Sequence, residues 1–115
     1  MPHYLLQVSY TPEGWASLVR QPEDRAEIIR PLIERAGGKL EALYFSFGEH
    51  DVVLLAEIPD NVTTAALAMA VASAGAVSAF HTTVLLTSAE ARQAMERAAA
   101  IPYSAPGSKV PAGVR

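Results

Sequence analysis

The segment at residues 52–58 constrains the fold of this chain more than any other part of the sequence. It reads Val-Val-Leu-Leu-Ala-Glu-Ile and opens with an apolar run that does not alternate with polar residues. Successive side chains of a strand point to opposite faces of its sheet, so such a run is typical of a strand that is buried on both faces. We therefore expect a central strand here, in a sheet that is covered on both sides.

Three further segments are predicted to complete this sheet. Residues 3–10, 39–47 and 76–86 are rich in apolar, aromatic and β-branched residues, and turn-forming residues bound them. The sequence Gly-Glu-His-Asp at residues 48–51 can turn the chain tightly. The second strand and the strand at 52–58 should therefore form a hairpin.

A helical region is predicted between the first two strands. Residues 12–36 carry apolar residues at intervals of three and four, which predicts two helical pieces that share one apolar face. Trp15 follows this spacing and is expected in the core. Pro22 is expected to restart the helix, and Pro31 should bend the second piece about one turn earlier, because it cannot donate a backbone hydrogen bond.

Two more helices and a tail follow in the second half of the chain. Residues 61–74 predict a helix. From residue 65 to residue 74 it is small and apolar all round, a pattern typical of burial on more than one side, which favours assembly beyond a dimer. A capping box at residues 87–90, Thr-Ser-Ala-Glu, begins a short last helix. The tail at residues 101–115 is rich in proline and glycine and is expected to be disordered or to form an arm on a neighbour.

The resulting order β-α-β-β-α-β predicts a ferredoxin-like α+β fold with an extra C-terminal helix. Right-handed crossovers place both main helices on one face of a four-stranded sheet, with the first strand between the third and the fourth. The other face is left open, yet the apolar strand at 52–58 requires a cover there. The simplest cover is the same face of a second copy of the chain, so we expect a homo-oligomer of two or more subunits.

Composition limits the class of protein. A chain of 115 residues suits one domain, which we place at residues 1–100. Half of the residues are hydrophobic and 18% are charged, a balance that again suggests burial shared with a partner. The net charge is −3 and Lys and Arg form no cluster, so nucleic acid is not an expected partner. The absence of cysteine excludes disulfides and thiolate sites.

A cytoplasmic location and no membrane partner are expected. The N-terminus enters a strand directly, without the basic and apolar regions of a secretory signal. Residues 61–87 carry no charged residue, but hydroxyl side chains, Gly75 and His81 interrupt them. This stretch is therefore interpreted as helix, turn and strand instead of a membrane span.

Four spaced motifs carry a resemblance to a known family. They are Thr11-Pro12-Glu13-Gly14, Gly37-Gly38-Lys39, Phe47-Gly48-Glu49-His50-Asp51-Val52-Val53 and Pro59-Asp60. Together they resemble the GYD-domain family, small bacterial proteins assigned to the dimeric α+β-barrel superfamily, over about residues 3–90. The resemblance implies a ferredoxin-like fold that pairs into a dimeric α+β barrel. It implies no established reaction, because the family is largely uncharacterised, and His50 stands where the family commonly has Tyr.

The hairpin residues Glu49, His50 and Asp51, together with Tyr44, are the hypothetical catalytic residues. Two carboxylates and an imidazole at a strand end could act as a general acid and a general base. The alternative is a structural turn, because Gly accepts positive φ and an Asp side chain can bond nearby backbone amides. The turn is the favoured interpretation of the two, since short motifs of this size often arise by chance.

Tyr10, Ser46, Gln7 and His81 are the hypothetical ligand-binding residues. They are polar groups on otherwise apolar strands, and in a barrel closed by two sheets such groups can converge on a pocket. Isolated polar residues are also routine in strands, so each of them can equally be structural.

The three histidines show no metal-binding motif. His3 and His50 are expected near the same edge of the sheet, with His81 further along the last strand. None of them has the spacing of a paired metal ligand. We therefore expect no metal and no cofactor.

Two classes of function stay open from the sequence. The first is a small-molecule-binding protein or a cofactor-independent enzyme, with a cavity between the sheet and the first helical region; this is analogy at the level of the fold. The second is a non-catalytic protein of oligomeric assembly or regulation. The hairpin carboxylates favour the first class, whereas the Ala-rich helix and the tail favour the second.

Overall fold

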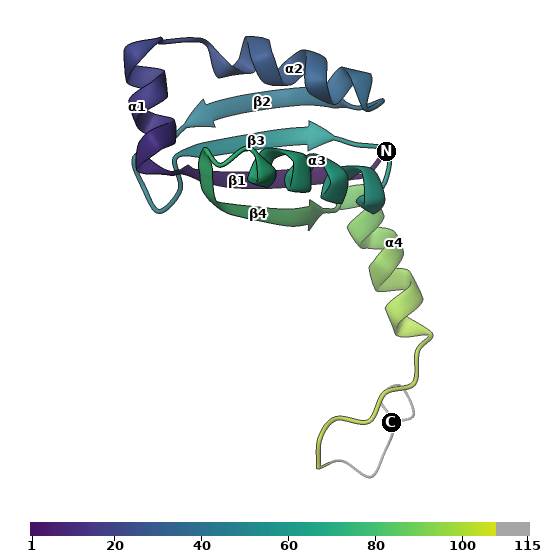
Figure 1. The fold of residues 1–115 in the computed structure, drawn as a ribbon. Coiled ribbons are helices and arrows are strands. Elements are labelled where there is room, and N and C mark those ends of the chain that lie inside the picture. Colours follow the sequence, from purple (N-terminus) through teal and green to yellow (C-terminus); the bar gives the residue numbers. More distant parts are fainter. Residues whose placement is uncertain (108–115) are drawn as a thin grey trace. The chain divides into compact units, whose positions relative to one another are not determined.

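The computed structural model describes residues 1–107, which contain four strands and four helices (Figure 1). Residues Met1–Leu85 form one compact unit and a second unit begins at Leu86. The elements of the first unit are β1 (His3–Tyr10), α1 (Pro12–Arg20), α2 (Arg25–Arg35), β2 (Lys39–Phe45), β3 (Val52–Glu57), α3 (Asn61–Ser73) and β4 (Val77–Leu85), and α4 (Ser88–Ala99) belongs to the second.

The four strands form one antiparallel sheet in the order β2-β3-β1-β4. The predicted ferredoxin-like α+β arrangement is confirmed, and β1 and β3 are the central strands as expected. In the register, Leu6 of β1 lies opposite Leu54 of β3 and Thr82 of β4.

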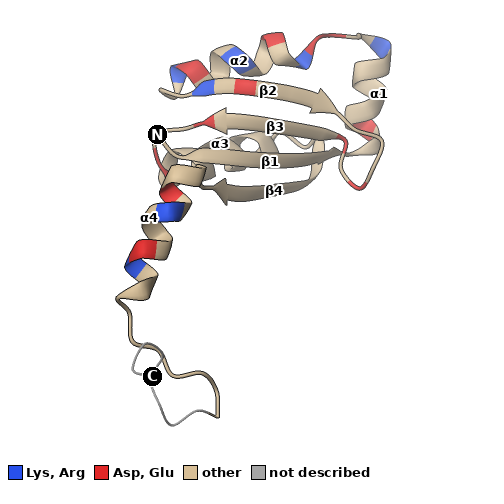
Figure 2. Cartoon of the chain, turned by 180° about the vertical axis from the view of Figure 1, so that it is seen from behind, with Lys and Arg blue, Asp and Glu red and all other residues tan. Residues whose placement is uncertain are grey.

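The two faces of the sheet differ in what covers them. Every second residue of β1 and β3 is buried on the face toward α2 and α3: Tyr4, Leu6, Val8, Val52, Leu54 and Ala56. The alternate residues, among them Leu5 and Leu55, are only half-buried. They lie on the face turned toward the viewer in Figure 2, which no helix of the unit at residues 1–85 covers. We call it the open face.

The first helical region differs from the prediction in its geometry. α1 stands across one end of the sheet, whereas α2 runs along β2 (Figure 1), so the two pieces form no continuous apolar face. Pro22 does not restart the helix. α2 begins later because the Asp24 carboxylate caps it, accepting a hydrogen bond from the Ala26 amide at 3.0 Å. Pro31 lies inside α2, which continues to its predicted end.

Trp15 of α1 was expected in the core but is 37% exposed. Its ring contacts Tyr10 edge-on, with 5.3 Å between the ring centroids. The apolar spacing of α1 therefore marks a contact with the end of β1, because α1 lies beyond the edge of the sheet's buried face.

Helix caps follow the sequence signals closely. Gly37, after α2, has a φ of 88°, the left-handed conformation that a glycine cap supplies. Thr87 and Glu90 form both hydrogen bonds of the predicted capping box of α4. In α3, Val62 is 80% exposed and Met69 is 70% exposed, so the predicted burial of this helix on several sides is not present within the unit.

No helix within residues 1–107 is long and apolar enough to cross a membrane. Residues 101–107 follow α4 without helix or extended strand. The rest of the predicted tail, residues 108–115, lies outside the described residues.

Gly14 allows α1 to approach the turn before β4, and its replacement should destabilise the fold. A Cβ atom at Gly14 would lie 2.5 Å from the carbonyl oxygen of Ala76. Gly14→Ala should therefore lower the free energy of unfolding by about 1–3 kcal/mol, as overpacking does, measured by urea denaturation. Gly48→Ala is the matched control, because nothing lies within 4 Å of that position. Equal stability of the two variants would contradict the close approach.

Candidate functional site

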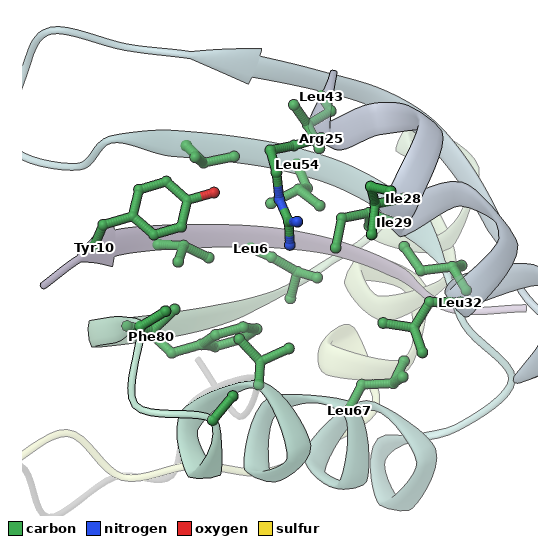
Figure 3. Close-up of a pocket in the computed structure, with 17 residues that line it drawn as sticks. Leu6, Tyr10, Arg25, Ile28, Ile29, Leu32, Leu43, Leu54, Leu67 and Phe80 are labelled. Carbon is green, nitrogen blue, oxygen red and sulfur yellow. The ribbon is translucent and has the colours of Figure 1, made fainter. Parts of the chain in front are cut away.

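A cavity of about 240 Å³ lies on the helix side of the sheet (Figure 3). It exists because α2 packs over β2 and α3 packs over β4, at opposite margins of the sheet, and side chains do not fill the space between the two helices. An engineered cavity of about 150 Å³ already accommodates benzene. This cavity is therefore large enough for a small bicyclic molecule.

The walls of the cavity are apolar and come from three sides. α2 contributes a row of aliphatic side chains, the sheet contributes its central strands and Phe80, and α3 contributes the remaining wall (Figure 3). The main apolar contributors are Ile28, Ile29, Leu32, Leu6, Leu54, Phe80, Leu67 and Val71. Such a lining binds apolar surface without demanding hydrogen bonds from it.

Tyr10 and Arg25 are the two polar side chains that line the cavity. The Tyr10 hydroxyl and the Arg25 guanidinium point into the same space from β1 and from the start of α2 (Figure 3). Nη1 of Arg25 also lies 2.7 Å from Oε1 of Glu23, in an ion pair of neighbouring residues. The cavity thus has one polar end, and the rest of its lining is apolar.

The phenol of Tyr10 reflects this mixed environment. Burial raises the pKa of Tyr10 above its ordinary value, and the positive charge and hydrogen bonding of Arg25 offset part of that increase. The negative charges of Glu23 and Asp51 raise the pKa further. Tyr10 is therefore a protonated hydrogen-bond donor at neutral pH.

Neighbouring residues hold Tyr10 in place. Its ring contacts Trp15 edge-on and stacks on Phe45, with 6.4 Å between the centroids of the Tyr10 and Phe45 rings. Its backbone amide donates a 2.8 Å hydrogen bond to Oδ2 of Asp51. Both the ring and the backbone of Tyr10 are thus fixed by contacts outside the cavity.

Asp51 makes several of the hydrogen bonds that hold the hairpin loop in place. The Asp51 amide donates to the carbonyl of Val8 and its carbonyl accepts from the Ser46 amide, both at 2.9 Å. The Ser46 hydroxyl donates to the carbonyl of His50. The Asp51 side chain does bond a backbone amide, but that of Tyr10 on β1 and not one within the turn, and Gly48 has no positive φ, so its predicted conformational role is wrong.

Most of the other predicted site residues lie on the open face, away from the cavity. Gln7 and His81 are direct partners across β1 and β4. The His50 ring lies 4.9 Å from the His81 ring, and Nδ1 of His50 lies 3.5 Å from the hydroxyl of Ser9. Tyr44 is 68% exposed on β2. Glu49 is exposed in the loop.

The predicted residues consequently divide into two groups on opposite faces of the sheet. Tyr10 lines the cavity, while Gln7, His81 and Tyr44 face the other way. Arg25 is the functional candidate that the sequence analysis missed. Its position depends on α2 beginning after the Asp24 cap, whereas the sequence pattern indicated a start at Pro22.

His3 lies at the opposite end of β1 from the hairpin, so the expected proximity of His3 and His50 is wrong. Nδ1 of His3 is 2.9 Å from Oε1 of Glu41, and Nε2 is 3.5 Å from Oε1 of Glu57. Glu41 reaches this position because the register shifts between Leu40 and Ala42. Within residues 1–107, this trio is the group whose ligand atoms are close enough to hold a metal ion.

Removal of the Asp51 carboxylate should destabilise the junction between β1 and the hairpin. Asp51→Ala should lower the free energy of unfolding by about 1.5–3 kcal/mol, because the Tyr10 amide loses a charged acceptor. Asp51→Asn keeps an oxygen acceptor and should lose less. Glu49→Ala, in the same loop, serves as the control in chemical denaturation. An Asp51→Ala protein as stable as the wild type would refute this role.

The comparisons with known proteins agree with the resemblance in the motifs. The sequence matches the GYD domain over residues 4–95, which is most of the chain. This sequence has no match among the curated proteins or among the solved structures. The chain therefore belongs to the GYD-domain family.

Proposed function

We propose that this protein binds a small apolar molecule in the cavity between the sheet, α2 and α3. The observation that carries the proposal is an unfilled apolar space with two convergent polar groups at one end. Ligand sites are typically concave and mostly apolar, with a small number of placed polar groups. The cavity of about 240 Å³ has this combination, which supports a binding function.

The positions of the hairpin residues favour binding over catalysis by the hairpin. Its side chains His50 and Glu49 do not line the cavity, and Asp51 acts on Tyr10 through the backbone. A general base must come within hydrogen-bond reach of the group that it deprotonates. A ligand inside the cavity would not meet that condition with these residues.

We also propose that two copies of the chain pair through their open faces. The centre of this face is apolar, with Leu5, Val53 and Leu55 half-buried and Tyr44 exposed. β1 and β4 carry no Lys, Arg, Asp or Glu, as the uncoloured strands in Figure 2 show. A second copy offers an identical apolar sheet face, which a two-fold axis can place against the first.

Filling the cavity should abolish ligand binding without unfolding the protein. In Val71→Phe the larger ring occupies the space between α3 and the sheet. The wild type should gain thermal stability from small bicyclic compounds, by about 2.7 kcal/mol at a ligand concentration of about 100 Kd. Val71→Phe should show no such gain in the same thermal-shift assay.

Val62→Phe is the matched control for this experiment. It makes the same change on the same helix, at a position that is 80% exposed. This variant should respond to the compounds as the wild type does. A Val71→Phe protein that still responds fully, or a wild type that responds to no compound, would rule out the cavity as the binding site.

The pairing of open faces predicts the mass of the particle in solution. Light scattering should give about twice the chain mass of 12.2 kDa at micromolar concentration. Leu55→Glu places a charge at the centre of the open face and should produce a monomer. Val19→Glu, at a position of α1 that is 75% exposed, should leave the mass unchanged. A monomeric wild type would show that the open face is not covered by a second copy.

A further inference from the structure

The polar end of the cavity presents two hydrogen-bonding side chains, the Tyr10 hydroxyl and the Arg25 guanidinium, which point into the same space. Arg25 can only donate, and the protonated Tyr10 hydroxyl can also donate. The guanidinium has five N–H groups, and the Glu23 carboxylate occupies Nη1. Both side chains can donate to a ligand and only the Tyr10 oxygen can accept from one, so the site favours a ligand that carries an acceptor.

The charge around this end disfavours an anionic acceptor. Three charged groups act on Tyr10, the cation Arg25 and the anions Glu23 and Asp51. Glu23 already neutralises Arg25 at 2.7 Å. A carboxylate ligand would bring a further negative charge into apolar surroundings, where an uncompensated charge costs several kcal/mol. A hydrogen bond to a charged group returns about 1.5–3 kcal/mol, which is less than this cost, so a neutral acceptor is favoured over a carboxylate.

The hydrogen-bond donor Tyr10 is also held in a fixed position. Trp15 and Phe45 hold the ring of Tyr10, and Asp51 holds its backbone amide. A fixed donor favours a rigid ligand, whose acceptor oxygen stands at a constant distance from its apolar body. The volume of the cavity sets the size of that body at about two fused rings.

We infer that the ligand of this cavity is a compact, uncharged carbonyl compound whose oxygen accepts hydrogen bonds from the Tyr10 hydroxyl and Arg25, with Glu23 acting as the group that excludes carboxylates. This inference rests on the proposed binding function and specifies the chemical class of its ligand. In this inference the Glu23–Arg25 ion pair selects among ligands and does not serve only to stabilise the fold.

Three probes of matched shape test the inference by calorimetry: tetralin, α-tetralone and a tetralin carboxylate. The wild type should bind the ketone about two- to tenfold more tightly than the hydrocarbon, the range that one net hydrogen bond provides. It should bind the carboxylate more weakly than the ketone. Tyr10→Phe should remove the preference for the ketone while tetralin binding is retained, which shows that the cavity is intact.

Glu23→Gln tests the role of charge directly. It keeps a side chain of the same shape beside Arg25 and removes one negative charge. The affinity for the carboxylate should rise by about tenfold and that for the ketone should change by less than about twofold. An unchanged affinity for the carboxylate would overturn the inference about Glu23.

The remaining outcomes separate this inference from the proposed function. If the wild type binds tetralin as tightly as α-tetralone, the carbonyl inference is wrong and the cavity is still a binding site. If the wild type prefers the carboxylate, the neutral-ligand inference is wrong. If none of the three probes binds, both the inference and the proposed function fail.

Discussion

The alternation of side chains along β1 is the constraint on which the rest of this structure depends. Residues of one parity, such as Leu6 and Tyr10, face the helices, and residues of the other parity, such as Leu5 and Gln7, face away. Because β1 and β3 are both central, the same division runs through the middle of the sheet. The molecule therefore has two separate apolar environments, a cavity on one side and an open face on the other.

The hairpin and the cavity are connected through β1 even though they share no lining side chain. Asp51 bonds the backbone of Tyr10, and Tyr10 presents its hydroxyl to the cavity. Among the hairpin residues, Asp51 thus affects the cavity by fixing the end of a strand, not by contacting a ligand. This arrangement gives Asp51 of the hairpin a structural role next to the candidate site.

Much of the fold could be predicted from the sequence, because strand boundaries, caps and topology depend on local patterns. The placement of the candidate residues on two faces of the sheet could also be predicted, since Gln7 and Tyr10 are an odd number of positions apart on one strand and must point to opposite faces. The position of Arg25 could not be predicted, because it depends on α2 starting after Asp24 instead of at Pro22. The register shift that brings Glu41 to His3 leaves no local signature either.

The central claim is that a ligand enters the helix side of the sheet and leaves the open face untouched. Methyl-group NMR on the wild-type protein during titration with α-tetralone tests it most directly, because leucines of both faces report separately. The signals of Leu6, Leu54 and Leu67, which line the cavity, should shift, while those of Leu5 and Leu55 should change little. Shifts confined to Leu5 and Leu55 would place the ligand on the open face and contradict the account.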